Sequence, residues 1–242
     1  MYGRLYTENS PGARPKGSPP AVCPACGEGI AGRAHITLGC RDVAVNAHTT
    51  GRHNATGRAF VDEMERGNAG GCLIREDTGR GTLATAQRWT IHAGMVSDGA
   101  EAGSWPAAEA HIPDSVLYHT TSAAERVPDA STQQDMIGLE VGYCDEAATA
   151  DKCYQKLAVY APAVQRLRLA GGHKLDLRVQ ALGARVPVVR AEWSTWEDLG
   201  IPRERHTVLH RRIWRIAVTY LRAQVVAWRI ACAEAHPREG IG

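Results

Sequence analysis

Short apolar runs alternate with longer segments of helical spacing along this chain of 242 residues, and this alternation most constrains its fold. The apolar runs predict strands near residues 42–48, 72–76, 136–142 and 185–190. Helical spacing of apolar residues predicts helices near residues 56–66, 152–169 and 209–235. Strands and helices in alternation predict an α/β fold, in which helices flank a mixed central β-sheet.

The composition is that of an ordinary globular domain, with 44% hydrophobic and 22% charged residues. A net charge of +2 is by itself too small to indicate a nucleic-acid partner, so nucleic acid is not expected. No apolar run approaches the roughly 18 residues that cross a bilayer. Residues 1–20 also lack the apolar centre of a secretory signal. We therefore expect a cytoplasmic protein with no signal peptide and no membrane partner.

The N-terminal region differs in composition from the rest of the chain. Residues 1–22 are rich in Gly, Pro, Ser and Arg without periodicity, which predicts a flexible tail. Residues 23–40 contain a compact pair of cysteines, and residues 41–242 contain the predicted strands and helices. We therefore expect a short Cys-containing extension ahead of one α/β domain.

Cys23-Pro-Ala-Cys26 is a pair of the kind that supplies two thiolates to zinc in a zinc knuckle. His35 and Cys40 are the nearest residues that complete a set of four ligands. The alternative is a turn with free thiols. The chain has seven cysteines, an odd number, which favours a reducing compartment over a disulfide framework.

Three segments of the main domain contain chemically active side chains. The first, RDVAVNAHTT, predicts a strand that ends at His48. The second, GGCLIREDTGRGTLATAQRWTIHAG, contains Trp89 and His92. The third, DMIGLEVGYC, predicts a strand that contains Glu140. In order and content these segments resemble the type 2 N-acetylmuramoyl-L-alanine amidases, over roughly half of the chain.

The resemblance implies a zinc-dependent hydrolase of the amide bond between N-acetylmuramic acid and L-alanine, with peptidoglycan or muropeptides as substrate. It implies that His48 is the first zinc ligand and that Glu140 acts on the attacking water. It also implies that Trp89 and His92 line the substrate groove. A phage-encoded endolysin that reaches the cell wall on lysis or in a virion fits this activity, as does a wall-recycling enzyme.

The resemblance extends to an amidase-like α/β domain over residues 41–242, with insertions near 95–134 and 171–200. The family has a further histidine at a strand end, for which His210 is favoured and His173 is the rival. The family's last ligand, an aspartate or cysteine, has no counterpart after either histidine.

A catalytic zinc needs about three protein ligands, and His206 lies one helical turn before His210. On a helix both imidazoles share one face, so His48, His206 and His210 together predict a three-histidine zinc site. The alternative is that residues 203–212 begin a solvated basic helix.

Glu140 also has two interpretations. A carboxylate on an apolar strand costs several kcal/mol unless it is paired or protonated, and a role as general base would explain its presence. In the alternative, the strand alternates, with Glu140 directed to solvent and Ile137, Leu139 and Val141 directed inward.

Two other functions remain open. A non-catalytic amidase-like virion or assembly protein would explain the missing ligand and the long insertions. A nucleic-acid-binding protein would use the Cys23–Cys26 knuckle and the arginines of the last helix, and the near-neutral net charge makes it the least expected of the three. The last helix is otherwise typical of an amphipathic helix packed on the sheet.

Overall fold

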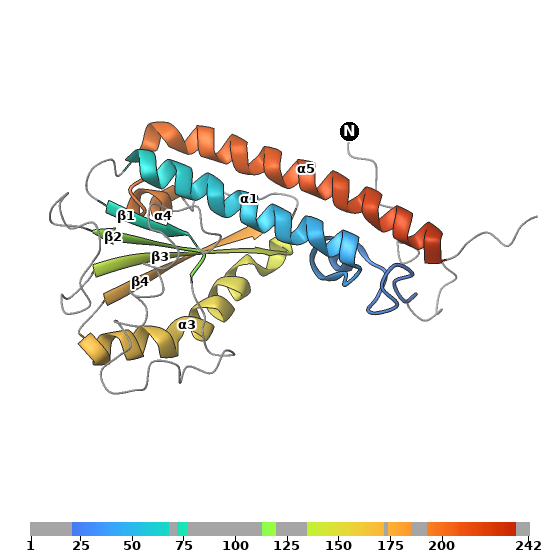
Figure 1. The fold of residues 1–242 in the computed structure, drawn as a ribbon, viewed down its shortest axis with the longest axis horizontal. Helices are drawn as coiled ribbons and strands as arrows, with labels where there is room; N and C mark the ends of the chain where they lie inside the picture. The colour runs from blue at the N-terminus through green and yellow to red at the C-terminus, as the bar shows by residue number, and fades with distance from the viewer. Residues whose placement is uncertain are drawn as a thin grey trace, which may run out of the picture. The chain divides into compact units, whose positions relative to one another are not determined.

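The computed structural model describes residues 21–67, 72–76, 113–119, 135–171, 174–184 and 193–235. The chain divides into two compact units. The first unit combines Met1–His53 with Trp214–Gly242, and the second is Asn54–Ile213. Two long helices, α1 (Val43–Gly67) and α5 (Arg203–Ala235), each contribute residues to both units (Figure 1).

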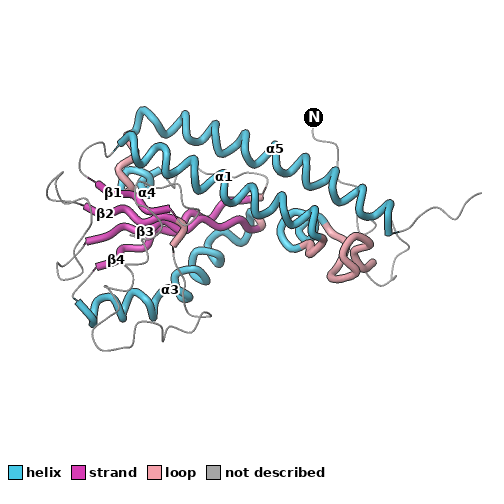
Figure 2. The backbone as a smooth tube through the Cα atoms, in the orientation of Figure 1, coloured by secondary structure: helices cyan, strands magenta, loops and turns pink. Residues whose placement is uncertain are grey.

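A four-stranded mixed sheet lies in the second unit, with the strand order β1-β2-β3-β4 (Figure 2). The strands are β1 (Cys72–Glu76), β2 (Ser115–His119), β3 (Asp135–Cys144) and β4 (Lys174–Gly183). β2 runs antiparallel to β1 and to β3, whereas β3 and β4 are parallel. The parallel pair is connected by a short 3₁₀ turn, η2 (Glu146–Ala148), and by α3 (Thr149–Gly171). A mixed α/β architecture is therefore confirmed.

Helices of the second unit cover both faces of β3. On one face, Glu140 contacts Lys156 and Tyr160 of α3. On the other face, the hydroxyl of Tyr143 lies 2.8 Å from the hydroxyl of Thr56 in α1. Because both faces are covered, β3 has an almost continuous apolar sequence in place of strict alternation.

Within the second unit, buried and charged contacts hold α1 beside the start of α5. Glu63 of α1 is 1% exposed and accepts two hydrogen bonds from Arg205, at 2.7 and 2.9 Å. Arg212 forms a second ion pair with Asp62 at 2.5 Å. The short helix α4 (Trp193–Asp198) adds fully buried Trp196, whose indole N–H donates to Gln180 of β4 at 2.7 Å.

In the first unit, the beginning of α1 packs against the end of α5. The amide of Gln224 donates to the Thr49 hydroxyl at 2.7 Å. A Cβ at Gly51 would lie 2.6 Å from the Tyr220 ring, so a larger residue there would require this ring to move. Val45 and Trp228 are buried in the core of this unit.

The predicted strand at 42–48 is wrong, because this segment forms the first turns of α1. Asp42 explains the helix start, since its carboxylate accepts a hydrogen bond from the backbone N–H of Val45 at 3.0 Å. Val45 is then buried and its neighbours Ala44 and Asn46 are exposed. The V-A-V pattern resembles a strand locally, and only the longer helical spacing after it identifies one continuous helix.

The other predicted elements agree more closely with the structure. The strands predicted at 72–76 and 136–142 are β1 and β3, and the three predicted helices lie within α1, α3 and α5. The regions predicted as insertions contain parts of the fold, because 95–134 includes β2 and 171–200 includes β4 and α4. The predicted strand at 185–190 lies outside the described residues. No helix in the described ranges is long and apolar enough to cross a membrane.

Candidate functional site

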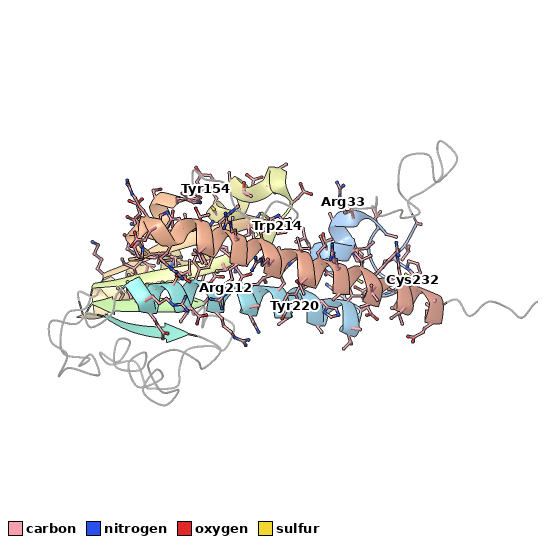
Figure 3. All side chains as sticks on the ribbon, turned by 90° about the horizontal axis from the view of Figure 1, so that it is seen from above. Arg33, Tyr154, Arg212, Trp214, Tyr220 and Cys232 are labelled. Atoms are coloured by element: carbon pink, nitrogen blue, oxygen red, sulfur yellow. The ribbon has the colours of Figure 1, made fainter. Side chains whose placement is uncertain are left out.

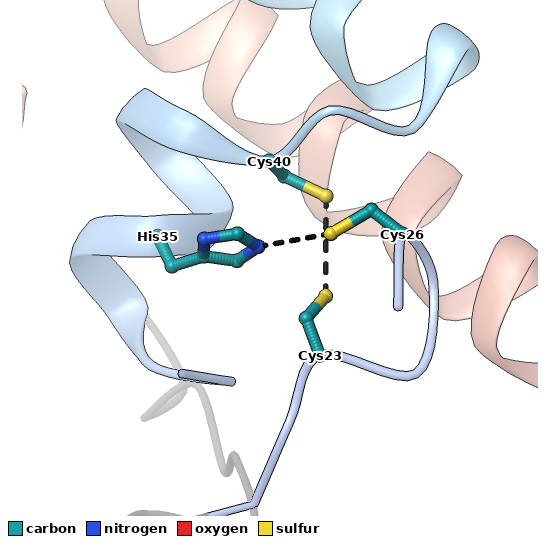
Figure 4. Close-up of side chains that lie close together, drawn as sticks. All are labelled: Cys23, Cys26, His35 and Cys40. Atoms are coloured by element: carbon teal, nitrogen blue, oxygen red, sulfur yellow. Dashed lines mark hydrogen bonds between the residues drawn. The ribbon is translucent and has the colours of Figure 1, made fainter. Parts of the chain in front are cut away.

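Four side chains of the first unit converge at the N-terminal cysteine pair (Figure 4). We call Cys23, Cys26, His35 and Cys40 the Cys₃His cluster, and their ligand atoms all lie within 4.8 Å of one another. Cys23 Sγ is 4.0 Å from Cys40 Sγ, and Cys26 Sγ is 3.3 Å from His35 Nε2. Tetrahedral zinc with Zn–S bonds of about 2.3 Å places two sulfurs about 3.8 Å apart. The spacing of the cluster therefore fits one tetrahedral ion.

The loop that carries the first two cysteines is shaped by backbone hydrogen bonds and glycines. The N–H of Gly27 donates to the Cys23 carbonyl at 2.8 Å, and the Cys23 N–H donates to the Gly29 carbonyl at 3.0 Å. Gly27 and Gly29 have φ angles of 69° and 68°, which residues with a side chain rarely adopt. A Cβ at Gly29 would also lie 2.7 Å from His35 Nδ1, so this glycine leaves room for the imidazole.

Burial alters the ionisation of the cluster. It raises the pKa of the Cys40 thiol to about 12 and lowers the pKa of His35, so the imidazole is neutral. Burial acts to raise the pKa of Cys23 as well, but hydrogen bonds from Trp228 and from the backbone outweigh it and lower that pKa. A neutral imidazole and a stabilised thiolate are the forms that bind a metal ion.

The sulfur and nitrogen donors can hold a metal ion, and four protein ligands leave no position for a substrate. The knuckle expected from the sequence therefore has its predicted residues in place, including His35 and Cys40. The rest of this core consists of Ala31, Ile36, Val45 and Trp228.

A second polar site lies in the second unit, around the buried carboxylate of Glu140, which is 3% exposed. Its Oε1 accepts a charge-assisted hydrogen bond from Lys156 Nζ, and its Oε2 accepts one from the Tyr160 hydroxyl at 2.8 Å. The alternative in which Glu140 is directed to solvent is wrong, because α3 covers this face of the sheet.

Asp114 adds a second carboxylate to this site. Ser115 pairs with Leu139 across β2 and β3, so Asp114, one residue earlier, lies opposite Glu140. Its Oδ2 accepts a hydrogen bond from the backbone N–H of Val141 at 2.6 Å. Like charges in directly opposed strand positions are destabilising unless a cation compensates them. We call Asp114, Glu140, Lys156 and Tyr160 the carboxylate site.

Burial and a neighbouring carboxylate alter the ionisation of Glu140. The pKa of Glu140 is raised, first by burial and then by the negative charge of Asp114, although Lys156 and Tyr160 act to lower it. Two lysines of α3 lie over the neighbouring Gly142, because a Cβ there would be 3.2 Å from Lys152 Cε and 3.8 Å from Lys156 Cε. The site therefore combines two carboxylates with the ammonium of Lys156 and the hydroxyl of Tyr160.

The predicted histidine ligands lie in different units. His48 is on α1 in the first unit, not at a strand end, and its ring meets the Tyr220 ring edge-on at 6.5 Å. His206 is on α5 in the second unit, 1% exposed, with Nε2 3.0 Å from the Ile201 carbonyl oxygen. Trp193 and Trp196 contact its ring edge-on. His206 thus already has a partner within a buried aromatic cluster.

His210 follows one turn later on α5 and is half-buried, so the expected helical spacing from His206 is present. Trp89, His92 and His173 lie outside the described residues. Among the residues that the structure describes, the Cys₃His cluster is the one set of three or more His, Cys, Asp or Glu ligand atoms that meets at a single point. The three-histidine zinc site stays a prediction.

Comparison with known proteins identifies no relative of this chain. No protein-family model matches the chain, and neither a curated protein nor a solved structure matches it. The resemblance to amidases therefore also stays a prediction.

Four residues of these sites were not predicted from the sequence: Asp114, Lys156, Tyr160 and Trp228. The spacing of Lys156 and Tyr160 does indicate a shared site, since two polar residues four apart on an apolar-faced helix lie on one side of it. No sequence pattern indicates the partners of Asp114 and Trp228, because only strand pairing and helix docking bring these residues to them.

Proposed function

We propose that the second unit is a divalent-cation-dependent hydrolase of phosphodiester bonds, with Asp114 and Glu140 as cation ligands. The observation that supports it is a pair of opposed carboxylates: Asp114, directly before β2, lies opposite Glu140 of β3, which is 3% exposed and is bound by Lys156. Burial, and then the negative charge of Asp114, raise the pKa of Glu140. A bound cation would offset the second of these effects.

Oxygen ligands favour Mg²⁺ or Mn²⁺ in this position. Mg²⁺ is commonly bound through one or two carboxylates together with the phosphate of the substrate and several waters. Such a cation polarises the phosphoryl oxygen and lowers the pKa of a bound water. The carboxylate site supplies the two carboxylates, and substrate would supply the remaining oxygen.

The other side chains of the carboxylate site have distinct roles in this proposal. The Lys156 ammonium, held at Glu140 Oε1, would stabilise the negative charge that grows on the phosphoryl group. The Tyr160 hydroxyl orients Glu140 through the bond to Oε2 at 2.8 Å. In this proposal Glu140 is again a catalytic residue, as the sequence predicts, but it binds the cation together with Asp114 and not beside a zinc ion held by His48.

Zinc is the ion that we propose for the Cys₃His cluster. Three thiolates and one imidazole in a closed tetrahedral set are typical of a structural zinc site. Its role here is to stabilise the segment before α1, because below roughly 40 residues a chain segment rarely has enough apolar core to fold without a metal or disulfides. The described part of that unit before α1 is shorter than this limit.

The distribution of charge favours a polyanionic substrate, despite the small net charge of the chain. The first unit contains 10 Lys and Arg against 5 Asp and Glu, a net charge of +5, and the second contains 18 against 21, a net charge of −3. Arg215, Arg222 and Arg229 are exposed and follow one another at intervals of seven residues, on one face of α5. Such a row can contact phosphates of a nucleic-acid backbone, so we propose nucleic acid as the substrate.

The test is cleavage of labelled single-stranded and duplex DNA and RNA by the full chain, with Mg²⁺, Mn²⁺ or EDTA. We expect cleavage that requires the cation, and at least a 100-fold loss in Glu140→Gln and Asp114→Asn, because a catalytic cation contributes several kcal/mol to the transition state. Asp151→Asn is the matched control, since Asp151 is an exposed carboxylate on α3. Cleavage unaffected by both site variants would overturn the proposal.

The amidase is the second candidate, and the burial of Glu140 on an apolar strand is the observation that favours it. Its first ligand, His48, lies on a helix, so the zinc would need a different arrangement from the one that the resemblance implies. The same set of variants should be incubated with purified muropeptides and the products identified by mass spectrometry. Release of free stem peptide, with no nucleic-acid cleavage, would select the amidase, and no cleavage of either substrate would favour an assembly role.

A further inference from the structure

Trp228 of α5 approaches the Cys₃His cluster without being a ligand. Its indole Nε1 lies 3.4 Å from Cys23 Sγ, which is within the range of an N–H···S hydrogen bond. The side chain is 9% exposed and belongs to the same core as Cys23, Ile36 and Cys40. An indole N–H is a donor only, so its direction toward sulfur fixes the role of each partner.

The indole N–H of Trp228 can stabilise the thiolate form of Cys23 by donating a hydrogen bond to its sulfur. Hydrogen bonds to a thiolate stabilise the form that binds metal, and groups that contact the ligands alter metal affinity by about 10- to 100-fold. The contact joins Trp228 Nε1 to the sulfur of Cys23, within a core that contains both side chains.

The position of Trp228 in the chain gives the contact a second consequence. The cluster lies between Cys23 and Cys40, whereas Trp228 lies near the end of the chain, on the last turns of α5. Ala227 and Cys232 of the same helix also pack against this core. Metal binding and the docking of the end of α5 therefore share one hydrogen bond and one apolar core within the first unit.

We propose that Trp228 is a positioning residue of the metal centre, whose N–H bond to Cys23 raises metal affinity and couples metal binding to the docking of α5. This inference rests on the proposed zinc at the Cys₃His cluster. It assigns to a residue far along the sequence a part in a site formed by residues 23–40.

The experiment is a competitive Co²⁺ and Zn²⁺ titration of the metal-free full chain, followed by the visible absorption of the Co²⁺ form. Trp228→Phe keeps an aromatic ring and removes the N–H. Replacement of Trp228 by benzothienylalanine keeps the shape of the indole and removes only the N–H, which separates the hydrogen bond from packing. Trp214→Phe is the matched control, because Trp214 lies on the same helix with 44% exposure (Figure 3).

We expect metal affinity to fall about 10-fold or more in both Trp228 variants, with a shift of the sulfur-to-cobalt charge-transfer band, and to be unchanged in Trp214→Phe. In the wild type, metal should slow amide hydrogen exchange over residues 224–232, and this protection should be weaker in the benzothienylalanine variant. Equal affinity, spectrum and protection in the wild type and that variant would overturn the inference. Failure of the wild type to bind either ion would instead overturn the zinc centre itself.

Discussion

At the residue scale, the two sites differ in how they balance charge. The Cys₃His cluster contains thiols that lose their protons when they bind a metal ion, whereas the carboxylate site places the negative charge of Asp114 beside the buried Glu140. Single substitutions should therefore separate metal affinity, stability and activity.

Gly29→Ala should weaken metal binding much more than Gly27→Ala. Both glycines have φ near 70°, so each alanine costs about 1–2 kcal/mol of backbone strain. Only at position 29 would the new Cβ meet His35, at 2.7 Å from Nδ1, whereas position 27 has open space. Zn²⁺ affinity measured by competition with a chelating dye checks this, and equal losses in the two variants would contradict it.

Glu140→Gln should change how stability depends on pH. The folded pKa of Glu140 is raised above its ordinary value, so its contribution to stability is complete below the ordinary carboxyl pKa and is lost as pH rises through the raised value. The wild type should therefore match the variant near pH 4 and become less stable than it toward neutral pH. Urea unfolding over this pH range measures the difference, and Mg²⁺ should reduce it by compensating the charge.

At the element scale, the second unit is held together where helices cross the sheet and where α1 meets α5. Glu63 is 1% exposed and is paired with Arg205 and Arg66, so a carboxylate that would be costly alone is compensated by two guanidinium groups. Trp196 of α4 adds an apolar contact to α1, since its ring meets the Phe60 ring edge-on at a centroid distance of 5.7 Å.

Glu63→Gln should destabilise the second unit by about 1–3 kcal/mol at neutral pH, because hydrogen bonds to charged groups are lost. The hydrogen bonds from Arg205 lower the pKa of Glu63, so its contribution is present above the ordinary carboxyl pKa and is lost as pH falls through the lowered value. The stability gap to the wild type should close in acid. Asp62→Asn is a suitable comparison, since Asp62 pairs with Arg212 at a half-exposed position and should cost less.

At the scale of the whole molecule, two compact units share two helices, and the core around the Cys₃His cluster belongs to the first unit. Removal of metal from the full chain with a strong zinc chelator should therefore unfold the first unit selectively. Hydrogen exchange should increase over residues 23–53 and 214–235, while β3 and β4 stay protected, because their hydrogen bonds belong to the second unit. Loss of protection throughout the chain would show that the two units unfold together.

The sequence determined the features that local physical chemistry decides. Spacing of apolar residues located α3, α5, β1 and β3, and the Cys23–Cys26 pair with His35 and Cys40 predicted the ligands of a metal centre. Helical period and ligand spacing are properties of neighbouring residues, so they can be recognised before the chain is folded.

Only the tertiary structure decided which distant residues meet. The strand predicted at 42–48 is helical because Asp42 caps a helix whose apolar face continues to Gly67. Asp114 reaches Glu140 through β2–β3 pairing, and Trp228 reaches Cys23 because the end of α5 packs against the core around the Cys₃His cluster. Such contacts depend on strand register and on helix packing between segments that are far apart in sequence. Burial and hydrogen bonding stabilise these contacts only after both segments are in place, so the local sequence does not reveal them.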